Sequence, residues 1–228
     1  MAKRESVKFI DCFGLAGDFG FWIKCLEKVE QYLYSKEKQW IAVHFHHRNP
    51  GMHWLKYNVT RWKIDLQSHG CQMIATTSFR EPVSRLKSYV YFNGIQKDNL
   101  SQWIIDYGEG KCQAAQLGYF LWNWYTPNQQ LPMKVIEPDE QRLITSMSMI
   151  EFWEIIELFD VVGFTENLGE FMDKIEERTK WKPLHSKRRV NITPIRKKYI
   201  ITDEQEKLMR HATITELQVY EKLKLKFM

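Results

Sequence analysis

The segment from Cys71 to Phe92 changes from strand-like to helix-like over a few residues, and this change constrains the fold of the chain more than any other feature. Residues Cys71–Thr77 are mostly apolar, which predicts a short buried strand. Residues Val83–Phe92 carry apolar side chains at helical spacing, and Pro82 suits the first helical turn because no backbone donor is needed there. The segment therefore predicts a strand, a tight turn and a helix.

Basic and hydroxyl side chains gather at this predicted turn. Arg80 precedes the helix, and Ser84, Arg85 and Ser88 lie on its first turns. A helix N-terminus beside an arginine favours an anion, because the first amides lack partners within the helix and the planar guanidinium matches a phosphate. The spacing leaves a second interpretation open, in which Arg80 pairs with a carboxylate and Ser88 is an ordinary helical serine.

The block RxPxxRxxSxxxF, which runs from Arg80 to Phe92, resembles the 3′-phosphate-binding segment of sulfotransferases. These enzymes use 3′-phosphoadenosine 5′-phosphosulfate (PAPS), and the likeness is greatest to the carbohydrate branch, such as the heparan sulfate 2-O- and 6-O-sulfotransferases. That family usually has aspartate where Glu81 stands. The resemblance implies that Arg80 and Ser88 bind the 3′-phosphate of the nucleotide.

A glycine-rich turn lies between a first predicted strand, Val7–Phe13, and a helix predicted from about Asp18 to Tyr34. Strand, glycine-rich turn and helix form a phosphate cradle of the P-loop type. In the family this turn holds the 5′-phosphosulfate, which implies cofactor contacts from Gly14, Ala16, Gly17, Asp18 and Gly20. The family's lysine is absent from the turn and Asp18 stands at the usual hydroxyl position, so a turn without a ligand is the alternative.

Histidines gather at the end of a second predicted strand, Trp40–His46. Ligands of open α/β sheets collect at the carboxyl ends of the strands, and a histidine there can act as a general base because its pKa lies near neutrality. A histidine ends the matching strand in the 6-O branch, so the resemblance implies His44 as the catalytic base, with His46 second. A histidine that satisfies a core hydrogen bond is the alternative, and a zinc site is only weakly indicated.

Two further segments resemble parts of the family that surround the nucleotide and the acceptor. The segment Thr126–Leu131 resembles the family's Asn-x-Gln segment, which implies acceptor-side roles for Asn128 and Gln130. The basic run Lys187–Lys198 matches a loop that closes over the nucleotide, which implies cofactor contacts from Arg188, Arg189 and Asn191. A plain turn and a solvated basic loop are the respective alternatives.

The segment from Phe159 to Met172 resembles the family's VG-x-TE junction between a strand and a helix. Its hallmarks are Gly163 in the strand and the pair Thr165 and Glu166 at the start of a helix that is predicted to run to about Trp181. The expected roles are structural, because Thr165 can cap the helix and Glu166 can stabilise its positive end.

The other elements are predicted from hydrophobic periodicity. Residues 49–70 read as polar and irregular around a short helix, and residues 99–124 carry two helical patterns. Helical spacing continues from Ile150 to Leu158 and, as one last helix, from about Thr202 to Phe227. Together these patterns predict a P-loop-like α/β fold of three layers, with a central parallel sheet flanked by helices and a single domain over residues 1–228.

Charge and cysteine usage limit the partners of the chain. A net charge of +5 suits an anionic cofactor or a polyanionic substrate, and no motif for nucleic acid accompanies it. The cysteines show neither a CxxC pair nor metal-ligand spacing, so no metal and no disulfide framework are expected, and Cys12 and Cys71 are predicted to be buried thiols. No signal or membrane-spanning segment is apparent, so the expected location is the cytoplasm, or the Golgi lumen for a trimmed domain.

The resemblance implies a transferase that moves the sulfuryl group of PAPS to a hydroxyl, expected on a carbohydrate, and releases 3′-phosphoadenosine 5′-phosphate. The absent lysine favours an alternative, a sulfotransferase-like protein that binds nucleotide or glycan without turnover. A nucleoside-triphosphate enzyme ranks lower, because the chain lacks GxxxxGK[ST].

Overall fold

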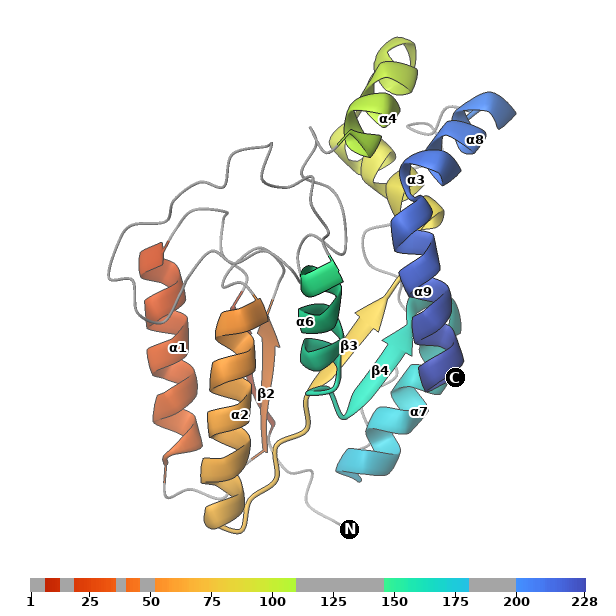
Figure 1. Cartoon of the computed structure of the whole chain (residues 1–228). Helices are drawn as coiled ribbons and strands as arrows, with labels where there is room; N and C mark the ends of the chain where they lie inside the picture. Colours follow the sequence, from red (N-terminus) through yellow and green to blue (C-terminus); the bar gives the residue numbers. More distant parts are fainter. Residues whose placement is uncertain (1–6, 13–18, 36–39, 46–51, 110–145, 181–199) are drawn as a thin grey trace, which may run out of the picture. The chain divides into compact units, whose positions relative to one another are not determined.

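The structure, a computed structural model, describes residues 7–12, 19–35, 40–45, 52–109, 146–180 and 200–228. The chain divides into two compact units (Figure 1). The first unit comprises Met1–Met73 and Leu121–Val135, and the second comprises Ile74–Phe120 and Ile136–Met228. Each unit has its own pair of parallel strands.

The first unit is built on a strand–helix–strand arrangement. Strand β1 (Val7–Cys12) pairs in parallel with β2 (Trp40–Phe45), and helix α1 (Phe19–Leu33) connects them. Helix α2 (Met52–Ser68) follows. Side chains from β1, α1 and α2 form a buried cluster of Ile10, Cys25, Val29 and Trp62.

The second unit contains the parallel pair β3 (Thr76–Phe79) and β4 (Val161–Phe164), in which Thr76 pairs with Val161 and Phe79 with Phe164. All residues of β4 are buried, whereas β3 buries only Phe79. The helices of this unit are α3 (Pro82–Asn93), α4 (Leu100–Gly108), α6 (Ser146–Ile156), α7 (Leu168–Thr179), α8 (Asp203–Ala212) and α9 (Ile214–Phe227), with 3-10 turns at η1 (Lys97–Asn99) and η3 (Thr165–Asn167).

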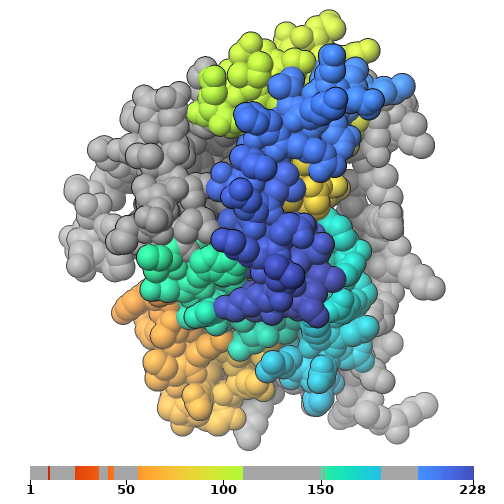
Figure 2. All heavy atoms as spheres, turned by 45° about the vertical axis from the view of Figure 1, so that its right-hand side comes forward, coloured from red at the N-terminus to blue at the C-terminus, as the bar shows by residue number. Residues whose placement is uncertain are grey.

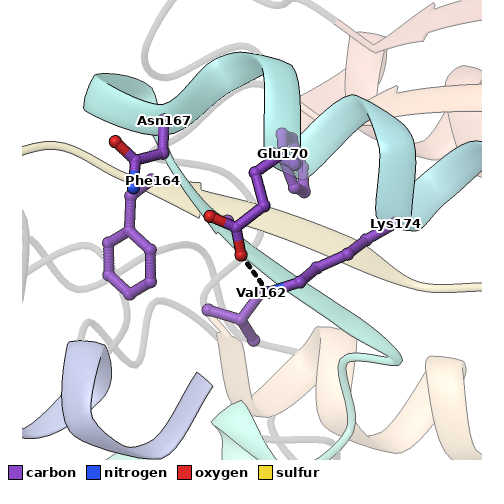
Figure 3. A pocket seen from close by; sticks show the side chains of 7 residues that line it. Val162, Phe164, Asn167, Glu170 and Lys174 are labelled. Carbon is purple, nitrogen blue, oxygen red and sulfur yellow. Dashed lines mark ion pairs between the residues drawn. The ribbon is translucent and has the colours of Figure 1, made fainter. Parts of the chain in front are cut away.

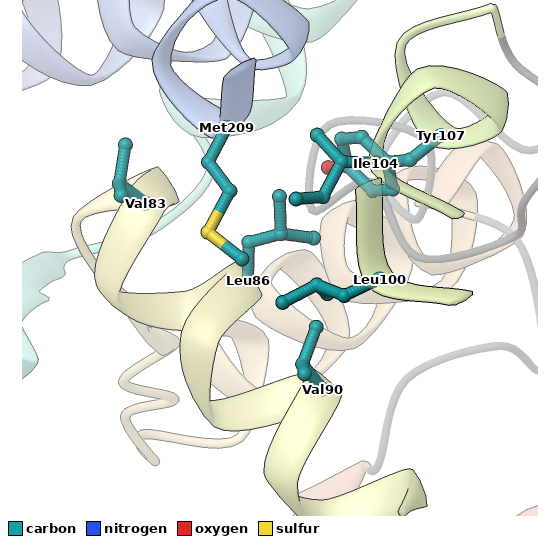
Figure 4. Close-up of a cluster of buried hydrophobic side chains, with 7 residues drawn as sticks. All are labelled: Val83, Leu86, Val90, Leu100, Ile104, Tyr107 and Met209. Atoms are coloured by element: carbon teal, nitrogen blue, oxygen red, sulfur yellow. The ribbon is translucent and has the colours of Figure 1, made fainter. Parts of the chain in front are cut away.

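Helix α3 is held in the second unit by a hydrophobic cluster (Figure 4). Its buried face has the spacing that the sequence predicts, because residues three or four apart share one side of a helix. These side chains meet others from α4 and α8, and the cluster consists of Val83, Leu86, Val90, Leu100, Ile104, Tyr107 and Met209. Helix α3 is therefore fixed along most of its length by contacts distant in sequence.

The strand predicted at Cys71 begins five residues later, at Thr76, and the prediction that Cys71 is buried is wrong. The backbone N–H of Cys71 donates to the Leu66 carbonyl at 2.8 Å, so this residue is bonded to the last turn of α2 and not to a strand. Contact with the strand partner starts at Ala75, whose N–H donates to the Asp160 carboxylate at 2.7 Å. The apolar run therefore predicted the strand's existence and misplaced its start.

Two helical predictions also differ from the structure. The region read as irregular with a short helix contains α2, a helix of 17 residues. The single last helix is two helices, α8 and α9, separated at Thr213. The buried Thr213 hydroxyl donates to the Met209 carbonyl at 2.8 Å, a local bond that competes with continuation of the helix.

The structure supports the coarse fold prediction, since helices accompany parallel strands in both units. The strand pairs form two separate sheets in the described residues, so the three-layer fold with one central sheet stays a prediction, as does the single domain. Cys25 is disulfide-bonded, whereas the sequence indicated no disulfide framework. Within the described ranges, no helix combines the length and the apolar character that crossing a bilayer requires.

Candidate functional site

The candidate site lies at the carboxyl ends of β3 and β4. Phe79 and Phe164 are paired in register, so the residues that follow them, Arg80 and Thr165, leave the sheet at the same edge. Each strand is then followed by a helix: β3 leads into α3, and β4 leads into η3 and then α7 (Figure 1). Ligands of α/β proteins bind at this kind of edge.

Glu81 caps the first turn of α3 with its own carboxylate. The backbone N–H groups of Val83 and Ser84 donate to the two Glu81 carboxylate oxygens at 3.2 and 2.6 Å. The next N–H, of Arg85, donates to the Glu81 carbonyl at 2.9 Å, and Pro82 has no N–H. The amides that the sequence predicted for an anion are thus occupied, so an anion at this turn has to be bound by side chains.

Arg80 comes just before this cap in the sequence, and Ser88 comes after it. Arg80 is exposed in the turn, and Ser88 is half-buried on α3, one helical turn beyond Ser84. Among the described residues, no carboxylate forms a hydrogen bond or an ion pair with Arg80. The alternative interpretation, in which Arg80 pairs with a carboxylate, therefore has no support in the described part of the chain.

A small hollow separates the Arg80 turn from helix α9. It measures about 10 Å³, room for one water molecule and far too little for a nucleotide. Its lining residues come from the end of β3, the turn and one face of α9: Phe79, Arg80, Pro82, Glu216, Val219, Tyr220 and Leu223. Helix α9 therefore lies directly against the base of the candidate site.

Glu166 connects the Arg80 turn with the end of β4 and with α9. One of its carboxylate oxygens accepts from the Glu81 backbone N–H at 2.9 Å and from the Thr165 hydroxyl at 3.2 Å. The other oxygen accepts from the Tyr220 hydroxyl at 2.8 Å. The prediction that Thr165 caps the helix is wrong, since Asn167 is the N-cap residue of α7 and makes no side-chain cap bond.

The protonation states of Glu166 and Tyr220 follow from the geometry of their contact. Burial raises the pKa of Glu166, but the hydrogen bonds from Glu81, Tyr220 and Thr165 outweigh it and hold that pKa below its ordinary value. Burial and the adjacent Glu166 carboxylate raise the pKa of the Tyr220 hydroxyl. The Tyr220 hydroxyl therefore donates to an ionised carboxylate across the neutral pH range.

The stability that Glu166 contributes is expected to disappear in acid. A carboxyl whose pKa is lower in the folded than in the unfolded state stabilises the fold above its ordinary pKa of 4.5, and this contribution is lost as the pH falls through the folded value. Urea unfolding of Glu166→Gln should show a deficit against wild type at neutral pH that narrows below pH 4.5 and closes once the pH is below the lowered folded-state pKa. A deficit that persists unchanged in acid would contradict this account. Glu177→Gln, an exposed change on α7, is the control.

The junction between β4 and α7 contains Gly163, as the family pattern predicts. A side chain at Gly163 would collide with Phe171, because a Cβ atom there would lie 2.0 Å from the Phe171 ring. The adjoining hollow is about 10 Å³, and the ion pair between Glu170 and Lys174, at 2.7 Å, lies beside it (Figure 3). Gly163 thus serves helix–strand packing, which agrees with the structural role expected for this segment.

Most of the other predicted site residues lie outside the described residues. Gly20 is the second residue of α1, and the backbone of His44 in β2 pairs with that of Asp11. Both belong to the first unit, whereas Arg80 and Ser88 belong to the second. The predicted residues outside the described ranges are Gly14, Ala16, Gly17, Asp18, His46, Asn128, Gln130, Arg188, Arg189 and Asn191.

Sequence reasoning missed the connecting roles of Glu81, Glu166 and Tyr220. A local signal exists for Glu81, because an acidic residue just before a proline and three residues before Ser84 is placed to cap a helix. No local signal links Glu166 to Tyr220, which lies 54 residues further along the chain.

Comparison with known proteins adds no relative. No family model matches the chain, and neither does any curated protein or any solved structure. Within the described residues, no three His, Cys, Asp or Glu side chains are grouped so that they could hold a metal ion.

Proposed function

We propose that the protein is a PAPS-dependent sulfotransferase that acts on a hydroxyl of a carbohydrate. One observation carries the proposal. Arg80 is exposed in the turn between a parallel strand and a helix that bears Ser88, which is the local arrangement that a 3′-phosphate-binding segment would need. The proposal includes a P-loop-like three-layer fold in which the strand pairs belong to one central parallel sheet and the chain forms one domain.

In this proposal Arg80 and Ser88 bind the 3′-phosphate of the nucleotide by charge-assisted and hydroxyl hydrogen bonds. Because Glu81 already occupies the α3 amides, recognition depends on these side chains, with Ser84 and Arg85 on the same helix as neighbours. The ordered turn supplies positioning, which accounts for much of the rate enhancement in group transfer.

The other predicted site residues have proposed roles in the transfer of the sulfuryl group. PAPS supplies the sulfuryl group and a phosphate leaving group. His44, with His46 second, accepts the proton of the acceptor hydroxyl as the hydroxyl oxygen bonds to sulfur and the bond from sulfur to the phosphate oxygen breaks. The amides of residues 14–20 hold the 5′-phosphate, the basic segment with Arg188, Arg189 and Asn191 contacts the nucleotide, and Asn128 and Gln130 face the acceptor.

A second candidate function is nucleotide or glycan binding without turnover. The absence of a lysine from the segment Phe13–Asp18 favours it, because this lysine is the cation expected beside the transferring group. Losing one such stabilising group commonly lowers the rate by about 10²–10³-fold. A protein that binds the nucleotide and transfers no sulfuryl group to any hydroxyl acceptor would fit this second candidate.

The disulfide at Cys25 bears on the compartment. Disulfides persist in oxidising compartments and are rare in the cytosol. Of the two locations that the sequence leaves open, the Golgi lumen suits a disulfide-bonded Cys25 better.

Binding of 3′-phosphoadenosine 5′-phosphate, measured by titration calorimetry, tests the proposal. We expect Arg80→Ala to weaken binding by about 10–100-fold, since a hydrogen-bonded pair with a charged group contributes about 1.5–3 kcal/mol. Arg178→Ala is the matched control, because it removes the same charge from an exposed position in the last turn of α7. Its affinity should equal that of wild type.

Two results would count against the proposal. A folded wild-type protein without measurable affinity would exclude the nucleotide site altogether. Equal losses in Arg80→Ala and Arg178→Ala would show that only the general positive charge attracts the nucleotide.

A further inference from the structure

The Glu166 carboxylate joins three parts of the second unit that are distant in sequence. It accepts hydrogen bonds from the backbone N–H of Glu81 in the turn and from the Tyr220 hydroxyl in the middle of α9, and also from its neighbour Thr165 in η3. The separations along the chain are 85 residues to Glu81 and 54 residues to Tyr220. A carboxylate in η3 that accepts from both the Arg80 turn and α9 fixes the relative positions of these three elements, since charge-assisted hydrogen bonds are stronger than neutral ones.

Tyr220 is itself held in place. Its ring packs edge-on against Phe164 with the centroids 5.5 Å apart, and the residue is 5% exposed. The end of α9 is attached to α7, because the Lys174 ammonium donates to the Phe227 carbonyl at 2.9 Å. On the other side, Lys226 pairs with Glu157 at 2.8 Å, just after α6. Figure 2 shows α9 between α6 and α7 on this face of the unit.

The peptide group between Arg80 and Glu81 is fixed from both sides of Glu81. The Glu81 N–H points to Glu166, whereas the Glu81 carboxylate points to the first amides of α3. Rotation of the turn would break either the bond to Glu166 or the cap. The starting direction of the Arg80 side chain is therefore set by Glu166 and, through it, by Tyr220.

We propose that Glu166 and Tyr220 are positioning residues for the anion site at Arg80, and that α9 fixes the geometry of this site without touching the ligand. This inference deepens the proposed function and depends on it for the identity of the ligand. Positioning has a large effect on such sites, since a displacement of 1 Å can lower activity by about 10²-fold. Tyr220 and Arg80 line the same small hollow, so a shift of α9 reaches the turn directly.

The test compares Tyr220→Phe with two controls. Tyr220→Phe removes one hydroxyl and keeps the ring that packs on Phe164. Tyr34→Phe removes an equivalent hydroxyl, one that donates to Asp65 at 2.7 Å in the first unit. Lys174→Met removes only the bond to Phe227 at the C-terminal end of α9 and leaves Tyr220, seven residues earlier, in contact with Glu166.

Two readouts are taken on each variant. The affinity for 3′-phosphoadenosine 5′-phosphate should fall about tenfold in Tyr220→Phe. This is less than the ~10²-fold effect of moving a positioned group by 1 Å, because the bond from Glu81 to Glu166 is loosened and not lost. Hydrogen exchange of the Glu81 amide, followed by NMR without ligand, should accelerate in Tyr220→Phe because the acceptor of this amide becomes mobile. Both controls should match wild type in affinity and in Glu81 exchange.

The two readouts separate failure of the inference from failure of the proposed function. If wild type does not bind the nucleotide, the proposed function fails and Glu81 exchange alone decides whether Tyr220 fixes the turn. Unchanged Glu81 exchange in Tyr220→Phe would overturn the inference. An unchanged affinity in Tyr220→Phe, with wild type binding normally, would also overturn it, as would an equal loss in Lys174→Met.

Discussion

Replacing Gly163 by alanine is expected to lower the free energy of unfolding by about 3 kcal/mol, the upper end of what overpacking usually costs. The new Cβ atom would lie 2.0 Å from the Phe171 ring and 2.7 Å from the Phe171 Cβ. A ring can rotate away, but a Cβ atom moves only with its backbone, so α7 has to move from the fully buried strand β4. Urea unfolding of Gly163→Ala against wild type measures this loss.

A glycine in the neighbouring helix provides the control. Gly169 is in the first turn of α7, and a Cβ atom there would meet no other atom within 4 Å. Gly169→Ala should be neutral or stabilise the protein by up to about 1 kcal/mol, because alanine favours the helix. Removing the ring in Gly163→Ala/Phe171→Ala should recover part of the loss, since the two sites are in contact. If Gly163→Ala is as stable as Gly169→Ala, the close packing of β4 on α7 is wrong.

Gly163 shows what a sequence pattern can predict and what it cannot. The resemblance to VG-x-TE predicted a glycine in a strand before a helix, and the structure places Gly163 in β4 ahead of η3 and α7. The pattern could not give the reason, because the atom that excludes a side chain belongs to Phe171, eight positions further on. Knowing that contact requires the angle at which α7 crosses β4.

Periodicity predicted most described elements because their buried faces follow simple rules of spacing. The face of α3 with Val83, Leu86 and Val90 is one example, since the structure buries all three. Periodicity failed at Thr213, where the apolar spacing continues but the helix ends. At this position the Thr213 hydroxyl bonds the Met209 carbonyl in addition to the Thr213 N–H, a contact that tends to bend a helix, and the pattern of apolar residues does not register it.

The candidate site was predictable only in its local part. Arg80 in a turn and Ser88 on the following helix both follow from residues close together in the sequence. The occupied amides of α3 and the contact from Tyr220 through Glu166 to Glu81 follow from tertiary structure. The sequence therefore indicated which side chains are proposed to bind an anion, and the structure adds which contacts surround them.

The cap formed by Glu81 changes how the site should be understood. A phosphate at the amides of α3 would replace a carboxylate that is already bound there, at 2.6 Å from Ser84 and 3.2 Å from Val83. An anion next to this carboxylate has to be neutralised by cations, and Arg80 is the nearest one along the chain. In the proposed site, Arg80 therefore contributes more to the affinity for an anion than it would at an open helix N-terminus.

The helix that carries Ser88 depends on Leu86, and Leu86→Ala is expected to lower the free energy of unfolding by about 2–5 kcal/mol. Leu86 is 0% exposed and lies in the cluster that joins α3 to α4 and α8, opposite Met209 and Leu100 (Figure 4). Truncation leaves a cavity among side chains that come from three helices. Thermal and urea unfolding of the purified variant, monitored by circular dichroism, give the loss.

Phe92 on the same helix is the matched control for Leu86. It is larger than Leu86 but 76% exposed, so Phe92→Ala removes little buried surface and should change stability by no more than about 0.5 kcal/mol. Both changes replace an apolar side chain by alanine, the residue that best favours a helix. The difference in stability loss between them therefore reports which face of α3 packs inward. A larger loss from Phe92→Ala than from Leu86→Ala would mean that α3 is rotated about its axis, and Ser88 would then lie on a different side of the Arg80 turn.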